Sequence, residues 1–218
     1  MRVSQLNIYP VKSMGGLSLT ELCIGALGPQ MDRRWMVVDE LTGHFITQRQ
    51  YSCLCFISAS LNGEALTLTA PMLEPLVISR QQSLQGVGRQ VKVWDDWVEG
   101  IDCGDCAAQW LSGFLGVAVR LVFMADGCRR LVDNHYAGHG EQVSFADGFP
   151  LLLASESSLD NFNQLIDSPI GLIRFRPNIV VSGCESYAED HWQKIQIGML
   201  RFDVVKPCSR CVIPSIEP

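Results

Sequence analysis

The chain has 218 residues, of which 47% are hydrophobic and 18% charged, a composition typical of a folded globular protein rather than a disordered one. Its net charge of −6 argues against the basic face that nucleic-acid binding requires. The sequence has no apolar run long enough to cross a bilayer and no signal-peptide core at its N-terminus, so we expect a cytoplasmic protein that binds neither nucleic acid nor membrane.

The first half of the chain carries the alternating apolar pattern of β-strands. The pattern predicts strands over residues 3–9, 17–24, 35–38, 44–47, 76–79 and 91–94. The clearest hairpin signal is Asn62-Gly63, between strands expected over 57–61 and 65–69, because these residue types accept the backbone angles of a tight turn.

A helix is expected over residues 106–115, where apolar side chains recur at helical spacing. A strand over 117–124 follows, and then a long polar loop over 125–142, of a kind that more often carries function than not. Ser157 and Asp160 have the spacing of a helix start, and strands are expected over 175–182 and 196–205. We therefore expect a β-rich α+β fold of barrel-like domains, with a first domain over 1–95 and a second over 96–218.

Nine cysteines, an odd number without framework spacing, indicate reduced thiols rather than disulfides. Two Cys-x-x-Cys pairs stand out, Cys103/Cys106 and Cys208/Cys211. Their distance along the chain disfavours a zinc ion shared between them. The second pair, with an Arg inside it, is typical of a soft-metal or redox site, and both readings stay open at this point.

Several basic residues lie at expected strand ends or inside strands, among them Lys12, Arg33 and Arg176. Each by itself is most simply a surface or ion-paired group. If they converged near a thiol, they would suit an anionic, phosphate-bearing ligand, because Arg offers a fork of donors and Lys a point charge. Periodicity does not tell whether they converge.

Seven short motifs carry a resemblance that spans nearly the whole chain: Y-P-V-K-S at 9–13, D-R-R-W at 32–35, I-T-Q-R-Q at 46–50, A-A-Q-W-L at 107–111, S-F-A-D-G-F-P at 144–150, F-R-P-N-I-V-V-S-G at 175–183 and K-P-C-S-R-C at 206–211. In this order and spacing the chain resembles the MOSC superfamily. It is similar to the branch with an N-terminal MOSC β-barrel domain, which includes bacterial relatives of the mitochondrial amidoxime-reducing component.

The resemblance implies that Cys211 is the protein ligand of the molybdenum in a molybdopterin cofactor, and a thiolate is a soft donor suited to that metal. It assigns Lys12, Ser13 and Arg33 to the phosphate-bearing end of the cofactor. Around the pterin and the metal it implicates Asp147, Gly148, Arg176, Asn178, Ser209 and Arg210. We expect Asp147 to manage protons during the reaction.

The function that this resemblance implies is reduction of N-hydroxylated compounds, with electrons from an external reductase and with an enzyme that is monomeric when complete. It also brings pyridoxal phosphate binding among the expected properties of the family. The alternatives are a carrier of the molybdenum cofactor or of sulfur without turnover, and an inactive protein. Family members continue well past the C-S-R-C motif, so we expect an incomplete second domain with unpaired strand edges, self-association and Cys211 on an exposed tail.

Overall fold

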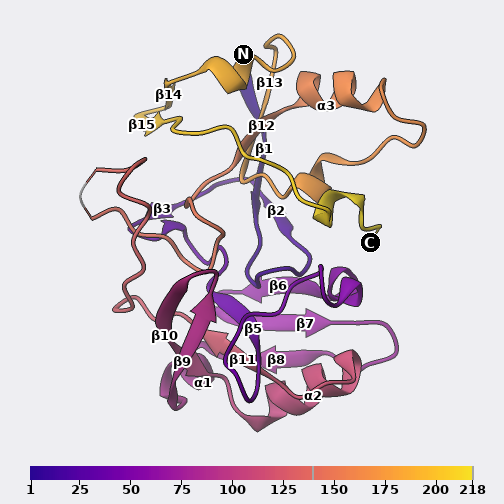
Figure 1. Ribbon diagram of the computed structural model, residues 1–218, viewed down its shortest axis with the longest axis vertical. Coiled ribbons are helices and arrows are strands. Elements are labelled where there is room, and N and C mark those ends of the chain that lie inside the picture. Colours follow the sequence, from indigo (N-terminus) through magenta and orange to yellow (C-terminus); the bar gives the residue numbers. More distant parts are fainter. Residues whose placement is uncertain (139, 218) are drawn as a thin grey trace.

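The computed structural model describes residues 1–138 and 140–217, and it consists of small sheets with few helices (Figure 1). The β-rich α+β class expected from the sequence is confirmed. One four-stranded sheet lies in the upper half of Figure 1, and the other large sheets lie below it.

The upper sheet joins the two ends of the chain. Its strand order is β12-β13-β1-β2, formed by Leu153–Ser155, Ile179–Ser182, Arg2–Ile8 and Leu17–Leu19. β13 runs antiparallel to β1, with Val3 opposite Val181, and parallel to β12. This long-range pairing brings the residues that follow β1 beside those that precede β13.

The second sheet has the order β5-β11-β10-β9, formed by Trp35–Asp39, Val119–Phe123, Asp96–Asp102 and Gly88–Val93. The segment 43–46 hydrogen-bonds to both of its edges, through the Phe45 N–H to the Lys92 carbonyl and the Ile46 N–H to the Val37 carbonyl, each at 2.9 Å. The sheet is therefore barrel-like. The strands within the described residues do not close into a full barrel.

A third sheet, β6-β7-β8, consists of Ser58–Asn62, Ala65–Thr69 and Leu76–Ile78. The hairpin predicted at Asn62-Gly63 is confirmed, with Gly63 at a φ of 58°. Helix α2, Asp105–Leu115, packs on β11 and ends at Gly116 in the left-handed conformation. Buried Leu54, Leu66, Leu111 and Leu121 join these elements into one hydrophobic core.

The sequence patterns missed or misplaced several features. Strand β10 was not expected, and the strand expected over 44–47 is reduced to isolated bridges at His44 and Phe45. Helix α1, Arg80–Gln85, was not expected, although Ser79 and Gln82 form its capping box. Helix α3, Glu156–Asn163, begins after Ser155 rather than Ser157, because the Ser155 hydroxyl accepts the hydrogen bond from the helix N-terminus. The strand expected over 196–205 is a hairpin of β14, Lys194–Ile197, and β15, Leu200–Asp203.

The remaining elements are short. β3, Ile24–Gly25, pairs with β4, Gly28–Pro29. Four turns of 3-10 helix complete the described chain: η1 at Ser52–Phe56, η2 at Leu172–Phe175, η3 at Ala188–His191 and η4 at Ile213–Ser215.

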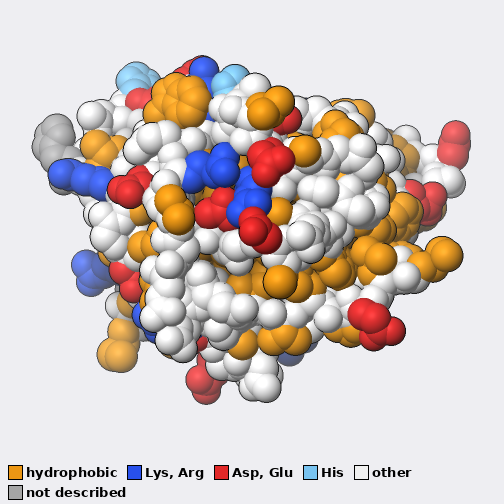
Figure 2. Space-filling model, turned by 90° about the horizontal axis from the view of Figure 1, so that it is seen from below, with side chains coloured by type: hydrophobic (Ala, Val, Ile, Leu, Met, Phe, Trp, Pro, Cys, Tyr) orange, Lys and Arg blue, Asp and Glu red, His pale blue; other side chains and the backbone are white. Residues whose placement is uncertain are grey.

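The end of the molecule that carries α1 and α2 is seen in Figure 2, where basic and acidic side chains lie next to one another. Arg120 in β11, for example, donates to Asp102 and to Asp105 at the start of α2, each at 2.8 Å. The mixture of charges indicates a solvated surface with local ion pairs.

The domain boundary expected between residues 95 and 96 falls in the turn that joins β9 to β10. The two strands of that hairpin pair along their whole length, from Asp96 opposite Val93 to Ile101 opposite Gly88. The division into 1–95 and 96–218 stays a prediction.

Candidate functional site

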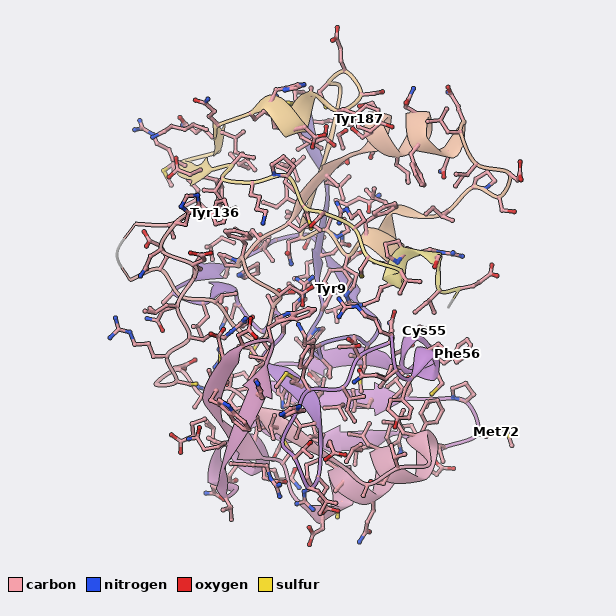
Figure 3. All side chains as sticks on the ribbon, in the orientation of Figure 1. Tyr9, Cys55, Phe56, Met72, Tyr136 and Tyr187 are labelled. Carbon is pink, nitrogen blue, oxygen red and sulfur yellow. The ribbon has the colours of Figure 1, made fainter. Side chains whose placement is uncertain are left out.

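Two of the predicted basic residues, Arg33 and Arg176, pack on Tyr9, which lies near the centre of the molecule (Figure 3) and is fully buried. The guanidinium carbons of Arg33 and Arg176 lie 4.5 Å and 4.2 Å from the centroid of its ring. The Tyr9 N–H donates to Asp32 at 2.8 Å, and its hydroxyl donates to the Pro177 carbonyl at 3.2 Å. Burial raises the pKa of Tyr9 to about 12, so its phenol is neutral at physiological pH.

Lys12 follows β1, and only 6% of it is exposed. Its ammonium donates to the Phe145 carbonyl at 2.8 Å and to Asp147 Oδ1 at 2.6 Å. Burial lowers the pKa of Lys12 to about 8; Asp147 opposes this change, and neighbouring arginines add to it. The ammonium is therefore charged at neutral pH but only partly compensated, which favours a further anion nearby.

Arg33 is fixed by a network that links the turn before β5 to the start of β13. Its Nη1 donates to Asp32 Oδ2 at 2.5 Å and to Asn178 Oδ1 at 3.0 Å, and its Nη2 donates to the Arg176 carbonyl at 3.1 Å. Asn178 also donates to Asp32 Oδ1 and to the Asn7 carbonyl, each at 3.1 Å. The structure thus brings Arg33 and Asn178 together.

Arg176 is the least satisfied of the basic residues. Its Nη1 donates to the Met14 carbonyl, but its buried Nη2 has no hydrogen-bond partner among the described residues. Burial and the repulsion of Arg33 lower the pKa of Arg176 to about 10. Its φ of 58° is strained for a side chain of this size. A buried donor without an acceptor among the described residues favours an added acceptor, such as a water molecule or an anion, at this position.

Ser13 and Gly148 border this cluster in different ways. Ser13 is buried with a φ of 67°, and its carbonyl accepts a hydrogen bond from the Gln48 side chain at 2.7 Å. A Cβ atom at Gly148 would meet nothing within 4 Å, so the space beside it is open. Both residues lie next in the chain to members of the cluster, Ser13 after Lys12 and Gly148 after Asp147.

Asp147 joins the cluster to the surface, with 71% of its side chain exposed. Its Oδ1 accepts from Lys12 and, at 3.1 Å, from the indole N–H of Trp94. Desolvation by the neighbouring residues tends to raise the pKa of Asp147. The charge of Lys12 and the hydrogen bonds from Lys12 and Trp94 outweigh it and lower this pKa below its ordinary value. Its carboxyl group is ionised at neutral pH.

Trp94 and Arg130 are site residues that the sequence reading missed. Arg130 is buried, and it donates to the carbonyls of Ser144, Ala146 and Asp147 at 2.9, 2.5 and 2.9 Å. For Trp94, the one signal in the sequence was its place at the turn of a hairpin, where small or polar residues are usual and a large aromatic residue is not.

The residues of the C-S-R-C motif lie at the surface. Cys208 and Cys211 are exposed, between β15 and η4, and the Ile213 N–H lies 3.5 Å from the Cys211 sulfur. Ser209 is exposed beside them. The side chain of Arg210 packs on Phe175, the last residue of η2, with its guanidinium carbon 5.1 Å from the centroid of the Phe175 ring.

The chain that follows this motif reaches the basic cluster. Ile213 and Ile216 line a cavity of about 80 Å³ together with Tyr9 and Arg176. The structure therefore places the residues just after Cys211 against the unpartnered guanidinium, while Cys211 itself faces solvent.

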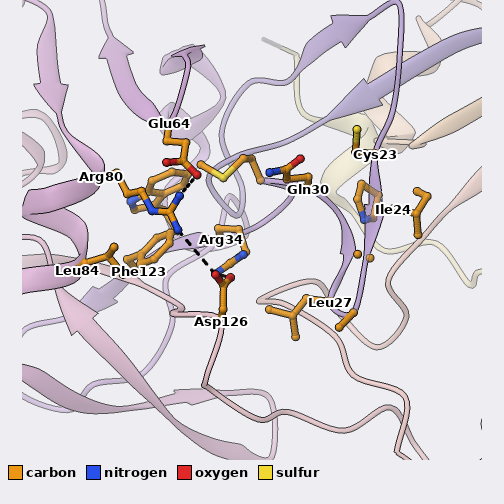
Figure 4. A pocket seen from close by; sticks show the side chains of 16 residues that line it. Cys23, Ile24, Leu27, Gln30, Arg34, Glu64, Arg80, Leu84, Phe123 and Asp126 are labelled. Atoms are coloured by element: carbon orange, nitrogen blue, oxygen red, sulfur yellow. Dashed lines mark hydrogen bonds and ion pairs between the residues drawn. The ribbon is translucent and has the colours of Figure 1, made fainter.

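A larger cavity, of about 380 Å³, is lined by residues of 23–31, by Arg34 and Trp35, and by side chains such as Arg80 and Asp126, and its lining contains none of the predicted site residues (Figure 4). Its charged side chains are paired with one another: Arg80 with Glu64 and Asp126, and Arg34 with Asp126. The smaller cavity, which holds an unsatisfied buried donor, is the better candidate for an anionic ligand.

A shared zinc site receives no support. In the described part of the chain, no three His, Cys, Asp or Glu side chains are grouped as metal ligands. Cys103 is buried, and burial raises the pKa of its thiol to about 12, whereas Cys106 is exposed in the first turn of α2. Cys103 is therefore a core residue.

The comparisons with known families identify the class of protein. The family model described as the MOSC N-terminal beta barrel domain matches residues 1–118, and that of the MOSC domain matches residues 140–218. The chain belongs to this family, and the resemblance read from its motifs is confirmed. The matched regions divide the chain at residues 118 and 140.

The chain is similar to amidoxime-reducing components of vertebrates. It is 34% identical to human mitochondrial amidoxime-reducing component 1 over 99% of its length, and 34% identical to bovine mitochondrial amidoxime reducing component 2 over the same share. The zebrafish component 1 is 32% identical over 99% of the chain and 69% of the relative. The chain spans 66% of the human and bovine proteins.

These relatives overturn one expectation. Each is named as mitochondrial, so the cytoplasmic location expected from the sequence is wrong. As for membranes, none of the helices in the described residues has the length and apolar character that a bilayer crossing needs.

Proposed function

We propose that the chain binds a pterin-based molybdenum cofactor and reduces N-hydroxylated compounds of the amidoxime type. The observation that carries this proposal is the buried basic cluster of Lys12, Arg33 and Arg176, in which one guanidinium nitrogen has no partner among the described residues. The names of the relatives, which are amidoxime-reducing components, supply the reaction class.

The cluster suits the phosphate-bearing end of such a cofactor. Burial, and after it the repulsion of Arg33, lowers the pKa values of both Lys12 and Arg176, and the charge of a bound dianion would offset both effects. A phosphate oxygen would also supply the acceptor that Arg176 Nη2 lacks. Arg33, fixed by Asp32 and Asn178, needs no rearrangement to present its guanidinium beside Tyr9.

Cys211 would supply the thiolate ligand of the metal. Its exposed sulfur is accessible, and the next residues, Ile213 and Ile216, already contact the cavity that Arg176 lines. Ser209 and Arg210 flank the ligand position, and Gly148 leaves open space beside Asp147. This donor set, one soft thiolate with cationic side chains, matches a sulfur-ligated metal with an anionic tail.

Asp147 would hold and transfer protons. Its ionised carboxylate, paired with Lys12 and exposed to solvent, can accept a proton from water or substrate. An anion that engaged Lys12 would weaken the Lys12–Asp147 pair and raise the pKa of Asp147 toward its ordinary range, which would help this group return a proton.

When bound, the cofactor supplies the two-electron chemistry that removes the hydroxyl oxygen from nitrogen. The net reaction consumes two electrons and two protons and releases water, so it needs an external reductase as a partner. A small N-hydroxylated molecule is the proposed substrate. A monomeric state and pyridoxal phosphate binding stay predictions.

The test is molybdenum content and reduction of a simple amidoxime, with a chemical electron donor, in the purified protein. Cys211→Ser should abolish turnover and lower the sulfur–molybdenum signal in X-ray absorption by the contribution of one sulfur, because a hydroxyl is a harder and poorer donor and the sulfur atoms of the pterin remain bound. Cys208→Ser is the matched control and should keep most of both. Molybdenum without turnover would favour the carrier function, and equal losses in the two variants with unchanged molybdenum would point to a redox dithiol.

A further inference from the structure

We propose that the turn of the β9–β10 hairpin, residues 94–96, is a positioning element of this site that holds the Asp147 carboxylate against Lys12. The inference rests on the proposed function only for the role of Asp147 in proton transfer. The positioning itself rests on two separate anchors, one at Trp94 and one at Asp96.

The first anchor is the indole of Trp94. Its N–H donates to Asp147 Oδ1 at 3.1 Å, the oxygen that also accepts from Lys12 at 2.6 Å. Because 71% of the Asp147 side chain is exposed, the ion pair alone leaves this carboxylate free to rotate toward water. A second donor on the same oxygen from a different element restricts that rotation.

Trp94 is itself held in an unusual conformation. Its φ is 55°, a left-handed region that large side chains rarely adopt and that strains the backbone. The centroid of its ring lies 5.1 Å from the centroid of the Phe45 ring and 4.8 Å from the guanidinium carbon of Arg49. The hairpin strands pair fully without this side chain, so turn formation does not explain a tryptophan at this position.

The second anchor passes through Arg130, which is 4% exposed. Asp96 accepts from Arg130 Nε at 2.8 Å, and the two Nη atoms of the same guanidinium donate to the carbonyls of residues 144, 146 and 147. The guanidinium of Arg130 thus fixes the backbone that carries Asp147, and the Asp96 carboxylate compensates the charge of Arg130. The turn therefore controls both the side chain of Asp147 and its backbone.

The first measurement is the indole ¹H–¹⁵N spectrum of the ¹⁵N-labelled protein, with the Trp94 signal assigned by Trp94→Phe. Asp147→Asn should shift the Trp94 signal upfield, because its hydrogen bond to a charged acceptor is lost, and should leave the signal of Trp97 in place. Trp97 is the internal control, because it lies on the same hairpin and packs on His44 instead. A Trp94 signal that ignores Asp147→Asn would overturn the first anchor.

The second measurement is amide hydrogen exchange over residues 144–148. Asp96→Asn should accelerate it by about tenfold, the loss expected when a charge-assisted hydrogen bond is weakened. Asp95→Asn is the matched control, because it makes the same change of charge in the same turn at an exposed residue next in sequence. Equal acceleration in both variants would mean that the charge of the turn, rather than the Arg130 contact, is responsible, and would contradict the proposal.

The third measurement separates positioning from mere stability. In the molybdenum-loaded protein, Trp94→Phe should lower kcat about tenfold with KM and molybdenum content unchanged. The double variant with Asp147→Asn should be no slower than Asp147→Asn alone, since Trp94 acts through that carboxylate. Additive losses would refute this. If the wild-type protein shows no turnover at all, the proposed function fails, and the spectra and exchange rates still decide the positioning.

Discussion

Replacing Arg176 by methionine tests whether the basic cluster is built for an anion. The substitution keeps a long, flexible side chain in the cavity and leaves the left-handed backbone at this position equally strained. It removes a buried charge that has one nitrogen without a partner among the described residues. A group retained for ligand binding at the expense of stability should make the ligand-free protein more stable when it is removed.

The structure sets the size of the effect. Burial and repulsion lower the pKa of Arg176 from 12.5 to about 10, and at 1.36 kcal/mol per pKa unit this corresponds to about 3 kcal/mol of unfavourable free energy in the charged form. The substitution also forfeits the hydrogen bond to the Met14 carbonyl and the stacking on Tyr9, each worth about 1 kcal/mol. We expect Arg176→Met to raise the free energy of unfolding by about 1 kcal/mol.

Urea unfolding with and without inorganic phosphate measures both halves of this expectation. At a phosphate concentration a hundred times the dissociation constant, the wild-type protein should gain about 2.7 kcal/mol and the variant almost nothing. Arg201→Met, at an exposed position of β15, is the control and should respond to phosphate like the wild type. The reasoning would be refuted if the free energy of unfolding of Arg176→Met without phosphate fell more than about 1 kcal/mol below that of the wild type. It would also be refuted if phosphate raised the free energy of unfolding of the variant as much as that of the wild type.

Four further outcomes follow from individual residues. Burial lowers the pKa of Lys12 to about 8, so phosphate binding measured by calorimetry should weaken about tenfold from pH 7 to 9, and should lose this dependence in Lys12→Gln. Over that range the free energy of unfolding of the ligand-free protein should rise, because the unfolded state, with a lysine pKa of 10.5, binds more protons. A thiol reagent followed by mass spectrometry should modify Cys208 and Cys211 rapidly and Cys103 only on unfolding, since burial raises the pKa of Cys103 to about 12. Gly28→Ala should lower the free energy of unfolding by about 1–3 kcal/mol, because its φ is +99° and the new Cβ would lie 2.7 Å from a proline side chain.

Local patterns predicted those elements whose geometry is decided by neighbours in sequence. Asn62-Gly63 correctly predicted the hairpin of β6 and β7, and the helical spacing of apolar residues before Gly116 correctly predicted helix α2. Helix α1 was not predicted, because six residues are too few to show a helical apolar pattern, although its Ser79–Gln82 capping box is present in the sequence. The turn that divides β14 from β15 was missed because Gly198 lies inside an otherwise alternating run.

The motifs of the sequence by themselves determined the family and named the basic residues and the cysteine pair that deserve testing. Only the tertiary structure decided that Lys12, Arg33 and Arg176 share one buried cluster, because the pairing of β1 with β13 joins segments from opposite ends of the chain. The roles of Trp94 and Arg130 follow from the same long-range packing, since nothing within a few residues of either one indicates Asp147 as its partner. The strength of the cluster as an anion site depends on desolvation, and burial is a property that the fold creates and that no short stretch of sequence contains.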